Sequence, residues 1–146
     1  MTVANSGRND PYKNFNFRVE IDGIAVAGFS ECTGLRVEID VIEYREGGEP
    51  TAVRKLPGLA KVGDITLKRG ITASKELHDW LESVRNGVAS RKNGVILLLD
   101  DERQPVVRWK FLNAFPRKWE GPSLDAKGND VAIETLTLCC EGLERE

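Results

Sequence analysis

Residues 35–45 read Leu35-Arg36-Val37-Glu38-Ile39-Asp40-Val41-Ile42-Glu43-Tyr44-Arg45, and the first seven positions alternate between apolar and charged side chains. Successive side chains of a strand point to opposite faces, so this pattern predicts an amphipathic strand with one apolar face and one charged face that meets water. A strand restarts at Ile65 and Leu67, after a segment that is too basic and too rich in glycine to pack as core.

The segment between these two strands, residues 43–63, contains four glycines and two prolines. Connections of this length are uncommon within compact domains and are usually functional or disordered. Because a single small domain has little internal use for such a projection, we predict that 43–63 forms a projecting hairpin or loop that contacts a neighbouring subunit. The predicted contacts are the aromatic, basic and apolar side chains Tyr44, Arg45, Arg54, Lys55, Leu56, Leu59 and Lys61.

The length of 146 residues predicts one domain with one core, which we place at 11–146, preceded by a flexible polar arm at 1–10. The 21 Lys and Arg against 23 Asp and Glu give a formal net charge of −2. This near balance argues against a broad cationic surface for nucleic acid, and it does little to oppose self-association. Because the first residues are polar and no long apolar run occurs, we expect no signal peptide and no membrane anchor in this sequence.

The three cysteines are Cys32, Cys139 and Cys140. An odd count with one adjacent pair is a poor disulfide framework, so we expect synthesis in a reducing cytoplasm. Adjacent residues on a strand point to opposite faces, so Cys139 and Cys140 do not readily share one metal ion. Small core residues are the simpler interpretation.

Most of the remaining pattern predicts antiparallel strands. Residues 15–21 alternate, Asp22-Gly23 is a hairpin signal, 24–29 returns as the partner strand, and 30–34 interrupts it as a bulge or crossover. After a turn at 91–94, residues 95–99 form a buried strand, and 107–111 form another that ends at 114–116. In the last strand, 131–141, the apolar positions change from odd to even, which predicts a β-bulge at Glu134-Thr135.

One helix is predicted, at residues 73–86. Leu77, Trp80, Leu81 and Val84 form a single apolar stripe, with Thr72 or Ser74 as the N-terminal cap and Asn86-Gly87 as the stop. The fold class is therefore mainly β: an antiparallel sandwich or barrel of about seven strands with one α-helix packed outside.

The sequence predicts no catalytic, cofactor or metal site. The single histidine, His78, lies in the predicted helix with Glu82 one turn on. A catalytic role would need a nucleophile or carboxylate that converges on it, and a solvated helix face is the simpler interpretation. The glycine pairs lack the spacing of a phosphate loop, and the acidic run 100–102 lacks the further oxygen ligands of a calcium loop. The basic residues between positions 54 and 69 lack interleaved aromatic side chains, which argues against single-stranded nucleic acid.

Several blocks of sequence, taken in order, resemble the tail tube proteins of contractile phage tails and phage-tail-like contractile injection systems. The early blocks are Asp10-Pro11-Tyr12-Lys13-Asn14-Phe15-Asn16-Phe17, Val19-Glu20-Ile21-Asp22-Gly23, Gly28-Phe29-Ser30-Glu31-Cys32-Thr33-Gly34-Leu35, Glu43-Tyr44-Arg45-Glu46-Gly47-Gly48, Lys55-Leu56-Pro57-Gly58 and Leu67-Lys68-Arg69-Gly70. The late ones are Trp109, Asn113-Ala114-Phe115-Pro116, Trp119 and Glu141-Gly142-Leu143. The resemblance covers about residues 10–143.

The resemblance implies a barrel-like subunit of the phage tail tube type, whose hexameric rings stack into a hollow tube inside a contractile sheath. On contraction, the tube is expected to be driven through a target envelope and to deliver cargo. It implies that Arg36, Glu38 and Asp40 face the lumen. The implied partners are further copies of the chain, the sheath protein, a baseplate hub or tube initiator, tape-measure or terminator proteins, and a cargo that is DNA or protein. It further implies assembly in a bacterial cytoplasm and a place in a phage tail or a tail-like particle. Neither an enzyme activity nor sequence-specific nucleic-acid binding is expected.

Three alternatives remain open on sequence alone. Within the same class, the chain fits a baseplate-proximal tube initiator or the tube protein of a type VI secretion system. From other classes, a barrel of this size fits a small ligand such as a flavin, which requires a pocket with converging polar groups. A nucleic-acid-binding barrel is the third alternative, and its binding would depend on salt.

Overall fold

The computed structural model describes residues 11–13, 16–22, 24, 28–45, 47–48, 53–88 and 90–146. The described residues form nine strands and one helix: β1 (Phe17–Ile21), β2 (Glu31–Thr33), β3 (Val37–Tyr44), β4 (Arg54–Val62), β5 (Ile65–Gly70), α1 (Glu76–Arg85), β6 (Lys92–Leu99), β7 (Pro105–Glu120), β8 (Ile133–Cys139) and β9 (Gly142–Arg145). The predicted arm at 1–10 and most of the predicted return strand after Asp22 lie outside the described residues.

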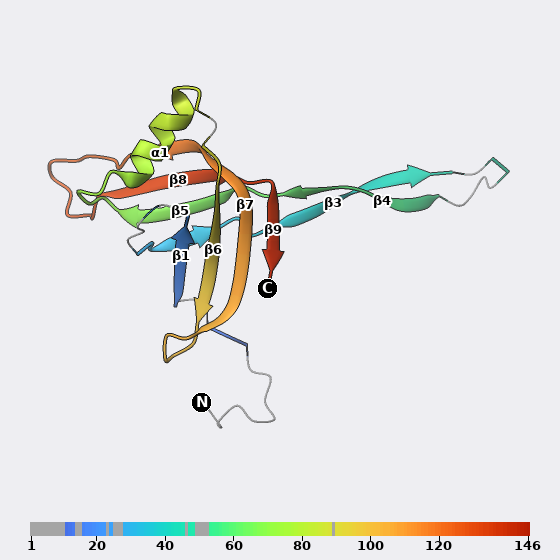
Figure 1. Cartoon of the computed structure of the whole chain (residues 1–146), viewed down its shortest axis with the longest axis horizontal. Helices are drawn as coiled ribbons and strands as arrows, with labels where there is room; N and C mark the ends of the chain where they lie inside the picture. The colour runs from blue at the N-terminus through green and yellow to red at the C-terminus, as the bar shows by residue number, and fades with distance from the viewer. Residues whose placement is uncertain are drawn as a thin grey trace.

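Seven strands form one antiparallel sheet in the order β1-β6-β7-β8-β5-β2, and β9 pairs with β7 beside this path. The sheet bends so that β1, β6 and β9 stand across the direction of β5 and β8 (Figure 1). Helix α1 lies beside β8 (Figure 1), and β3 and β4 form a separate two-stranded sheet. The predicted fold class, antiparallel and mainly β with one outer helix, is confirmed.

Strand β7 makes the bend. Its first half pairs with β6 and β9 and its second half with β8, so one strand of 16 residues belongs to both limbs of the sheet. The prediction that it ends at 114–116 is wrong. Asn113 adopts a positive φ of 52°, and the register shifts between Pro116 and Lys118. These irregularities turn the strand without ending it, as at the corners of orthogonally packed sheets.

The predicted turn at 91–94 is also wrong, because β6 already begins at Lys92. Gly94 lies within the strand, opposite Phe111. A Cβ atom added at Gly94 would lie 2.1 Å from Cζ of Phe111, so the ring occupies the space that any other side chain would need. The glycine here serves close packing rather than chain reversal.

The predicted bulge at Glu134-Thr135 does not exist. The pairing of β5 with β8 runs without a shift from Ile65 opposite Leu138 to Gly70 opposite Ile133. Glu134 continues the inward row of Leu136 and Leu138, because its carboxylate accepts a 2.6 Å hydrogen bond from Arg69 Nε. An inward ion pair, not an extra residue, therefore explains the change of apolar phase.

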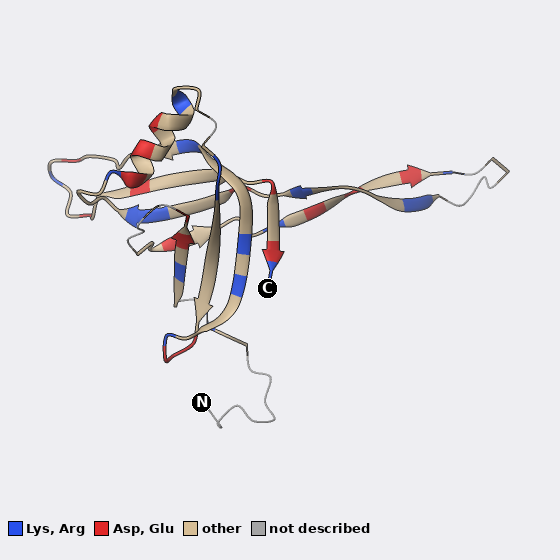
Figure 2. Ribbon diagram, in the orientation of Figure 1, with Lys and Arg blue, Asp and Glu red and all other residues tan. Residues whose placement is uncertain are grey.

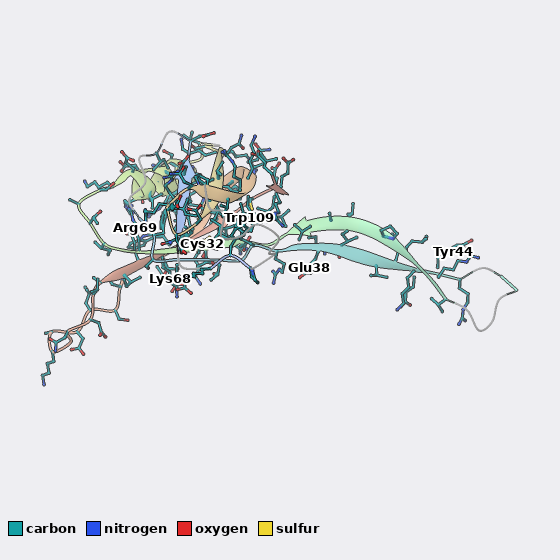
Figure 3. All side chains as sticks on the ribbon, turned by 90° about the horizontal axis from the view of Figure 1, so that it is seen from below. Cys32, Glu38, Tyr44, Lys68, Arg69 and Trp109 are labelled. Carbon is teal, nitrogen blue, oxygen red and sulfur yellow. The ribbon has the colours of Figure 1, made fainter. Side chains whose placement is uncertain are left out.

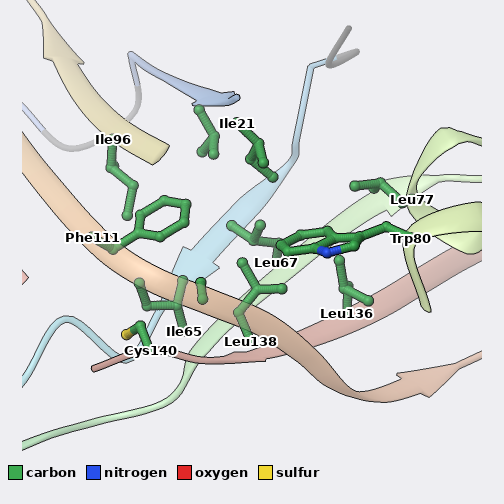
Figure 4. Packing of buried hydrophobic residues seen from close by; sticks show 12 residues of the cluster. Ile21, Ile65, Leu67, Leu77, Trp80, Ile96, Phe111, Leu136, Leu138 and Cys140 are labelled. Carbon is green, nitrogen blue, oxygen red and sulfur yellow. The ribbon is translucent and has the colours of Figure 1, made fainter. Parts of the chain in front are cut away.

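The core lies between the bent sheet and the helix (Figure 4). Phe111, Ile65 and Leu138 are fully buried there, and α1 contributes Leu77 and Trp80. The indole N–H of Trp80 donates a 2.6 Å hydrogen bond to the Ser90 carbonyl, which satisfies its polar atom. The apolar stripe of the helix thus packs as predicted for these two residues.

The ends of the helix differ in how well the sequence predicts them. The N-cap position is Lys75, without a side-chain cap, so capping by Thr72 or Ser74 is wrong. The Thr72 hydroxyl accepts instead from the backbone N–H of Ser74 at 3.3 Å, within the preceding turn. At the other end, Gly87 adopts a φ of 89°, which confirms the predicted left-handed stop.

Residues 31–33 form the short edge strand β2 rather than a bulge or crossover, and they pair with β5. Gly34 follows with a φ of 96° and lets the chain pass close to Asp64 before β3 begins. Strands β2 and β5 are therefore joined directly to β3 and β4, and the hairpin extends the same limb of the sheet (Figure 1).

Candidate assembly interface

The hairpin β3–β4 projects away from the rest of the molecule (Figure 1). Its strands pair antiparallel from Val37 opposite Val62 to Tyr44 opposite Arg54, with a register shift between Ile39 and Val41. Much of the segment that its glycines and prolines mark as a possible loop is thus strand β4, which includes Pro57 and Gly58. The shift gives the ladder an irregular point where these two residues are accommodated.

One face of the hairpin carries an uncovered apolar row. Val37, Ile39 and Val41 point to the same side, and their side chains are 52%, 59% and 63% exposed. Their cross-strand partners on that side are Val62, Ala60 and Pro57. A contiguous apolar surface on an exposed strand favours association with another chain.

Beyond the register shift, the apolar character changes face. Ile42 lies opposite Leu56, and Tyr44 opposite Arg54, on the side that carries charges nearer the base. The exposed fractions of Ile42, Leu56 and Tyr44 are 51%, 46% and 45%, and that of Leu59 is 77%. The tip and the base of the hairpin therefore offer apolar contacts in opposite directions.

The seven predicted contact residues do not form one surface. Five of them lie on the outer half of the hairpin, namely Tyr44, Arg45, Arg54, Lys55 and Leu56. Leu59 lies beside the register shift, and Lys61 lies at the base, where its ammonium pairs with Asp40 at 3.3 Å.

The prediction missed Val37, Ile39, Val41 and Ile42, although the alternation of residues 35–41 is the signal that identifies most of them.

The opposite face at the base of the hairpin holds the three residues predicted to face the lumen. Arg36 Nε lies 3.3 Å from a Glu38 carboxylate oxygen, and Asp40 pairs with Lys61. All four side chains are largely exposed, so each pair stabilises the fold by only about 0–1 kcal/mol. The structure brings the three predicted residues together on one charged face.

A second set of exposed apolar residues, which the sequence did not predict, lies at the end of the seven-stranded sheet that is far from the hairpin. Leu124 and Val131, in the connection between β7 and β8, are 86% and 75% exposed, and Ile71 is 44% exposed. The Ile71 N–H donates to the Ala132 carbonyl at 2.9 Å, which holds Ile71 beside Val131. Val131 precedes β8, and its odd number, out of step with the buried Leu136 and Leu138, is the signal that marks it as surface.

The groups considered for chemistry do not converge. His78 is 51% exposed and meets the Trp119 ring edge to face at 5.8 Å. The Asp100 carboxylate accepts 2.9 Å hydrogen bonds from the N–H groups of Glu102 and Gln104, which closes a turn. Among the residues that the structure describes, no group of three His, Cys, Asp or Glu side chains could hold a metal ion.

One groove beside the helix has a volume of about 190 Å³ and is lined by Val84, Gly87, Val88, Ser90, Arg91 and Phe115. This is less than the ~300–1,000 Å³ of typical small-molecule sites. Within the described part of the chain, no helix has the length and apolar character needed to cross a membrane.

Comparison with known families gives one match over most of the chain. The family described as T4-like virus tail tube protein gp19 matches residues 13–144. Among curated proteins, no sequence matches significantly.

Solved structures of contractile injection systems contain similar chains. A chain in the sheath–tube complex of the extracellular system PVC, in its extended state, has 28% identity and a TM-score of 0.88, with 100% of this chain and 98% of that chain covered. A chain in the PVC sheath/tube terminator structure has 31% identity and a TM-score of 0.85, with 94% and 98% covered.

A chain in the baseplate of the anti-feeding prophage has 28% identity and a TM-score of 0.84, with 94% and 97% covered. Hcp1 from Flavobacterium johnsoniae, with 20% identity, a TM-score of 0.55 and 90% and 94% covered, shares the fold.

Proposed function

Because the chain belongs to the T4-like virus tail tube protein family and is a structural component of tail-like injection particles, we propose that its copies form hexameric rings through the β3–β4 hairpin. The rings stack into the hollow inner tube of a contractile particle. The apolar row of Val37, Ile39 and Val41, exposed in the lone subunit, carries this proposal.

The two apolar surfaces lie at opposite ends of the limb that contains β5 and β8 (Figure 1). The hairpin extends from one end, and the β7–β8 connection, which contains Leu124 and Val131, lies at the other. Surfaces that differ and lie at opposite ends support heterologous, head-to-tail association. Such contacts close into rings where the rotation permits and otherwise continue as filaments. The subunit has one domain, from residue 11 to 146, with 43–63 as its inter-subunit projection. The seven predicted contact residues of the projection bind two or more neighbours.

The proposed partners follow from the complexes in which similar chains occur, which contain a sheath and a tube, a baseplate or a terminator. We assign to this chain a place inside a sheath, between a baseplate hub or initiator and a terminator, with cargo in its lumen. It is assembled in a bacterial cytoplasm and has no catalytic role. A baseplate-proximal initiator is the second candidate, favoured by the similar chain in the anti-feeding prophage baseplate.

The test replaces the apolar row by threonine in a Val37→Thr/Ile39→Thr/Val41→Thr variant. The three side chains are exposed in the lone subunit, so the free energy of unfolding should change by about 0.5 kcal/mol or less per site. Rings and tubes, visible by negative-stain microscopy for the wild type, should be lost.

Val88→Thr, at a 58% exposed position beyond the helix, is the matched control and should assemble normally. Intact tubes of the triple variant would contradict the role of the hairpin. No rings or tubes from concentrated wild-type protein would contradict the proposed function itself.

A further inference from the structure

The outer face of the limb β2-β5-β8-β7, opposite helix α1, is covered by threonines and charged side chains. The strand registers align them in two rows across four strands. One row consists of Glu120, Thr135, Lys68 and Glu31, and the other of Lys118, Thr137, Thr66 and Thr33. Inward-facing Ile65, Leu67 and Arg69 alternate with the outward residues of β5.

This face continues onto the hairpin. Val62 packs against the core, so Lys61, its neighbour on β4, points outward, and Glu38 lies opposite Lys61. Figure 3 shows Lys68 and Glu38 on the same side of the sheet, with Arg69 on the side of the core. We call the combined surface the mosaic face: the two rows above together with Arg36, Glu38, Asp40 and Lys61.

Opposite charges on the mosaic face are paired within the subunit. The nitrogen–oxygen distances are 3.4 Å for Lys68–Glu31, 2.6 Å for Lys118–Glu120, 3.3 Å for Arg36–Glu38 and 3.3 Å for Lys61–Asp40. The hydrogen bond from Lys118 and its charge, together with the charge of Lys68, lower the pKa of Glu120. Lys68 therefore acts across β8 as well as on its own partner. The four cations and four carboxylates sum to zero formal charge (Figure 2).

We propose that the mosaic face lines the lumen of the tube and fits a polypeptide cargo of mixed charge, which slides over it without being held. This inference rests on the proposed tube. In the two rows, the side chains are threonines or members of ion pairs, so they offer no large apolar surface to which a chain could adhere. In a closed ring, the face repeats in every copy, and its charge balance repeats with it.

Charge balance also argues against nucleic acid as the fitted cargo. Nucleic acids bind proteins mainly because Lys and Arg side chains replace the counterions of the phosphates. Here Lys68 and Lys118 already face carboxylates, so a phosphate contact would leave Glu31 or Glu120 without its partner and add like-charge repulsion. A polypeptide carries charges of both signs at low density, so a face without net charge neither attracts it strongly nor repels it.

The experiment measures the co-sedimentation of labelled probes with assembled tubes at about 50 mM salt, where electrostatic binding is strong. The probes are a short oligothymidylate, an oligolysine and a peptide of balanced charge. Glu31→Gln/Glu120→Gln makes the face positive, and Lys68→Gln/Lys118→Gln makes it negative. Glu76→Gln/Glu144→Gln changes the charge equally on exposed residues of α1 and β9 and is the matched control.

Wild-type and control tubes should retain each of the three probes at the same low level. The positive variant should retain about tenfold more oligothymidylate, and the negative variant about tenfold more oligolysine, and added salt should abolish both gains. Strong, salt-dependent retention of oligothymidylate by wild-type tubes would overturn the inference and indicate a nucleic-acid conduit. An equal gain by the control would place the mosaic face outside the lumen.

Negative-stain images of each preparation separate this inference from the proposed function. Tubes with the wrong probe pattern contradict only the mosaic face. If wild-type tubes are absent, the proposed function fails, and the same probes on the dispersed protein then test the charge balance alone.

Discussion

Arg69 places a guanidinium in the interior, with a side chain only 3% exposed, and Glu134 supplies its counter-charge at 2.6 Å. The second oxygen of Glu134 accepts a 3.4 Å hydrogen bond from the Trp119 indole, and the Arg69 guanidinium lies 5.9 Å from the centre of the Phe29 ring. This pair fixes β5 against β8 and connects both to β7. Among the described residues, no buried side-chain nitrogen or oxygen atom lacks a hydrogen-bond partner.

Glu134→Ala should destabilise the subunit by about 3–5 kcal/mol, because it leaves a buried guanidinium without a counter-charge. Urea unfolding of the dispersed protein measures the loss. The double variant Arg69→Met/Glu134→Leu should recover most of the stability, since an apolar pair of similar volume often replaces a buried ion pair at little cost.

Asp40→Ala removes one partner of an exposed pair and is the control, with an expected change below about 1 kcal/mol. An equally small change for Glu134→Ala would show that the buried pair contributes little to the fold.

At the scale of elements, Gly34 sets the direction in which the hairpin leaves the body. It has a φ of 96°, and a Cβ atom there would lie 1.9 Å from the Asp64 carbonyl oxygen. The Gly63 N–H donates to the Arg36 carbonyl at 2.8 Å just beyond. The two chains therefore cross the junction nearly in contact, and any side chain at Gly34 must push them apart.

Gly34→Ala should cost about 1–3 kcal/mol through the unfavourable backbone conformation and the clash with Asp64. It should also displace the hairpin and prevent ring formation, as seen by negative-stain microscopy. Gly28→Ala, where an added Cβ meets nothing within 4 Å, should leave both assembly and unfolding unchanged. Normal tubes from Gly34→Ala would show that the direction of the hairpin is not fixed at this residue.

The elements also show how far the sequence predicts the fold. Alternation predicts the strands near 17–21, 37–41 and 107–111, and the apolar stripe predicts the helix, because both patterns depend only on local periodicity. The errors occur where a distant residue decides the local structure. The local sequence at Gly94 indicates a turn, but the glycine lies within a strand because Phe111 packs over it. The sequence at Glu134 indicates a bulge, but the strand stays regular because Glu134 pairs with Arg69.

The candidate interface was predicted in location but not in detail. Glycine and proline mark the projection, yet its pairing as β3–β4 depends on cross-strand register, which sequence periodicity does not give. Val37, Ile39 and Val41 have the pattern of core residues, and only the position of the hairpin outside the body leaves them exposed in the single subunit, where the proposed ring would cover them. The same holds for Leu124 and Val131, whose exposure depends on the end of the sheet at which they lie.

For the whole molecule, Cys32 and Cys140 connect stability to pH. Burial raises the pKa of each thiol to about 11, against about 8.5 for a free cysteine. The unfolded chain therefore loses these protons first. The stability from the buried neutral thiols is complete below about pH 8.5 and is lost as the pH rises through about 11.

The urea midpoint of the wild type should fall more steeply between about pH 8.5 and pH 10.5 than that of Cys32→Ala/Cys140→Ala. Other groups titrate in this range, so the difference between the two proteins is the quantity to compare. Parallel pH profiles would show that the folded state does not keep these thiols protonated.

In the proposed tube, strand β7 has a mechanical consequence for the way each subunit carries axial force. It belongs to both limbs of the bent sheet, paired with β6 and β9 before the corner and with β8 after it. Axial force on the limb that extends into the hairpin passes to the other limb along the covalent backbone of β7. It does not depend on side-chain packing between two separate sheets. Each subunit can therefore transmit axial force as one rigid body.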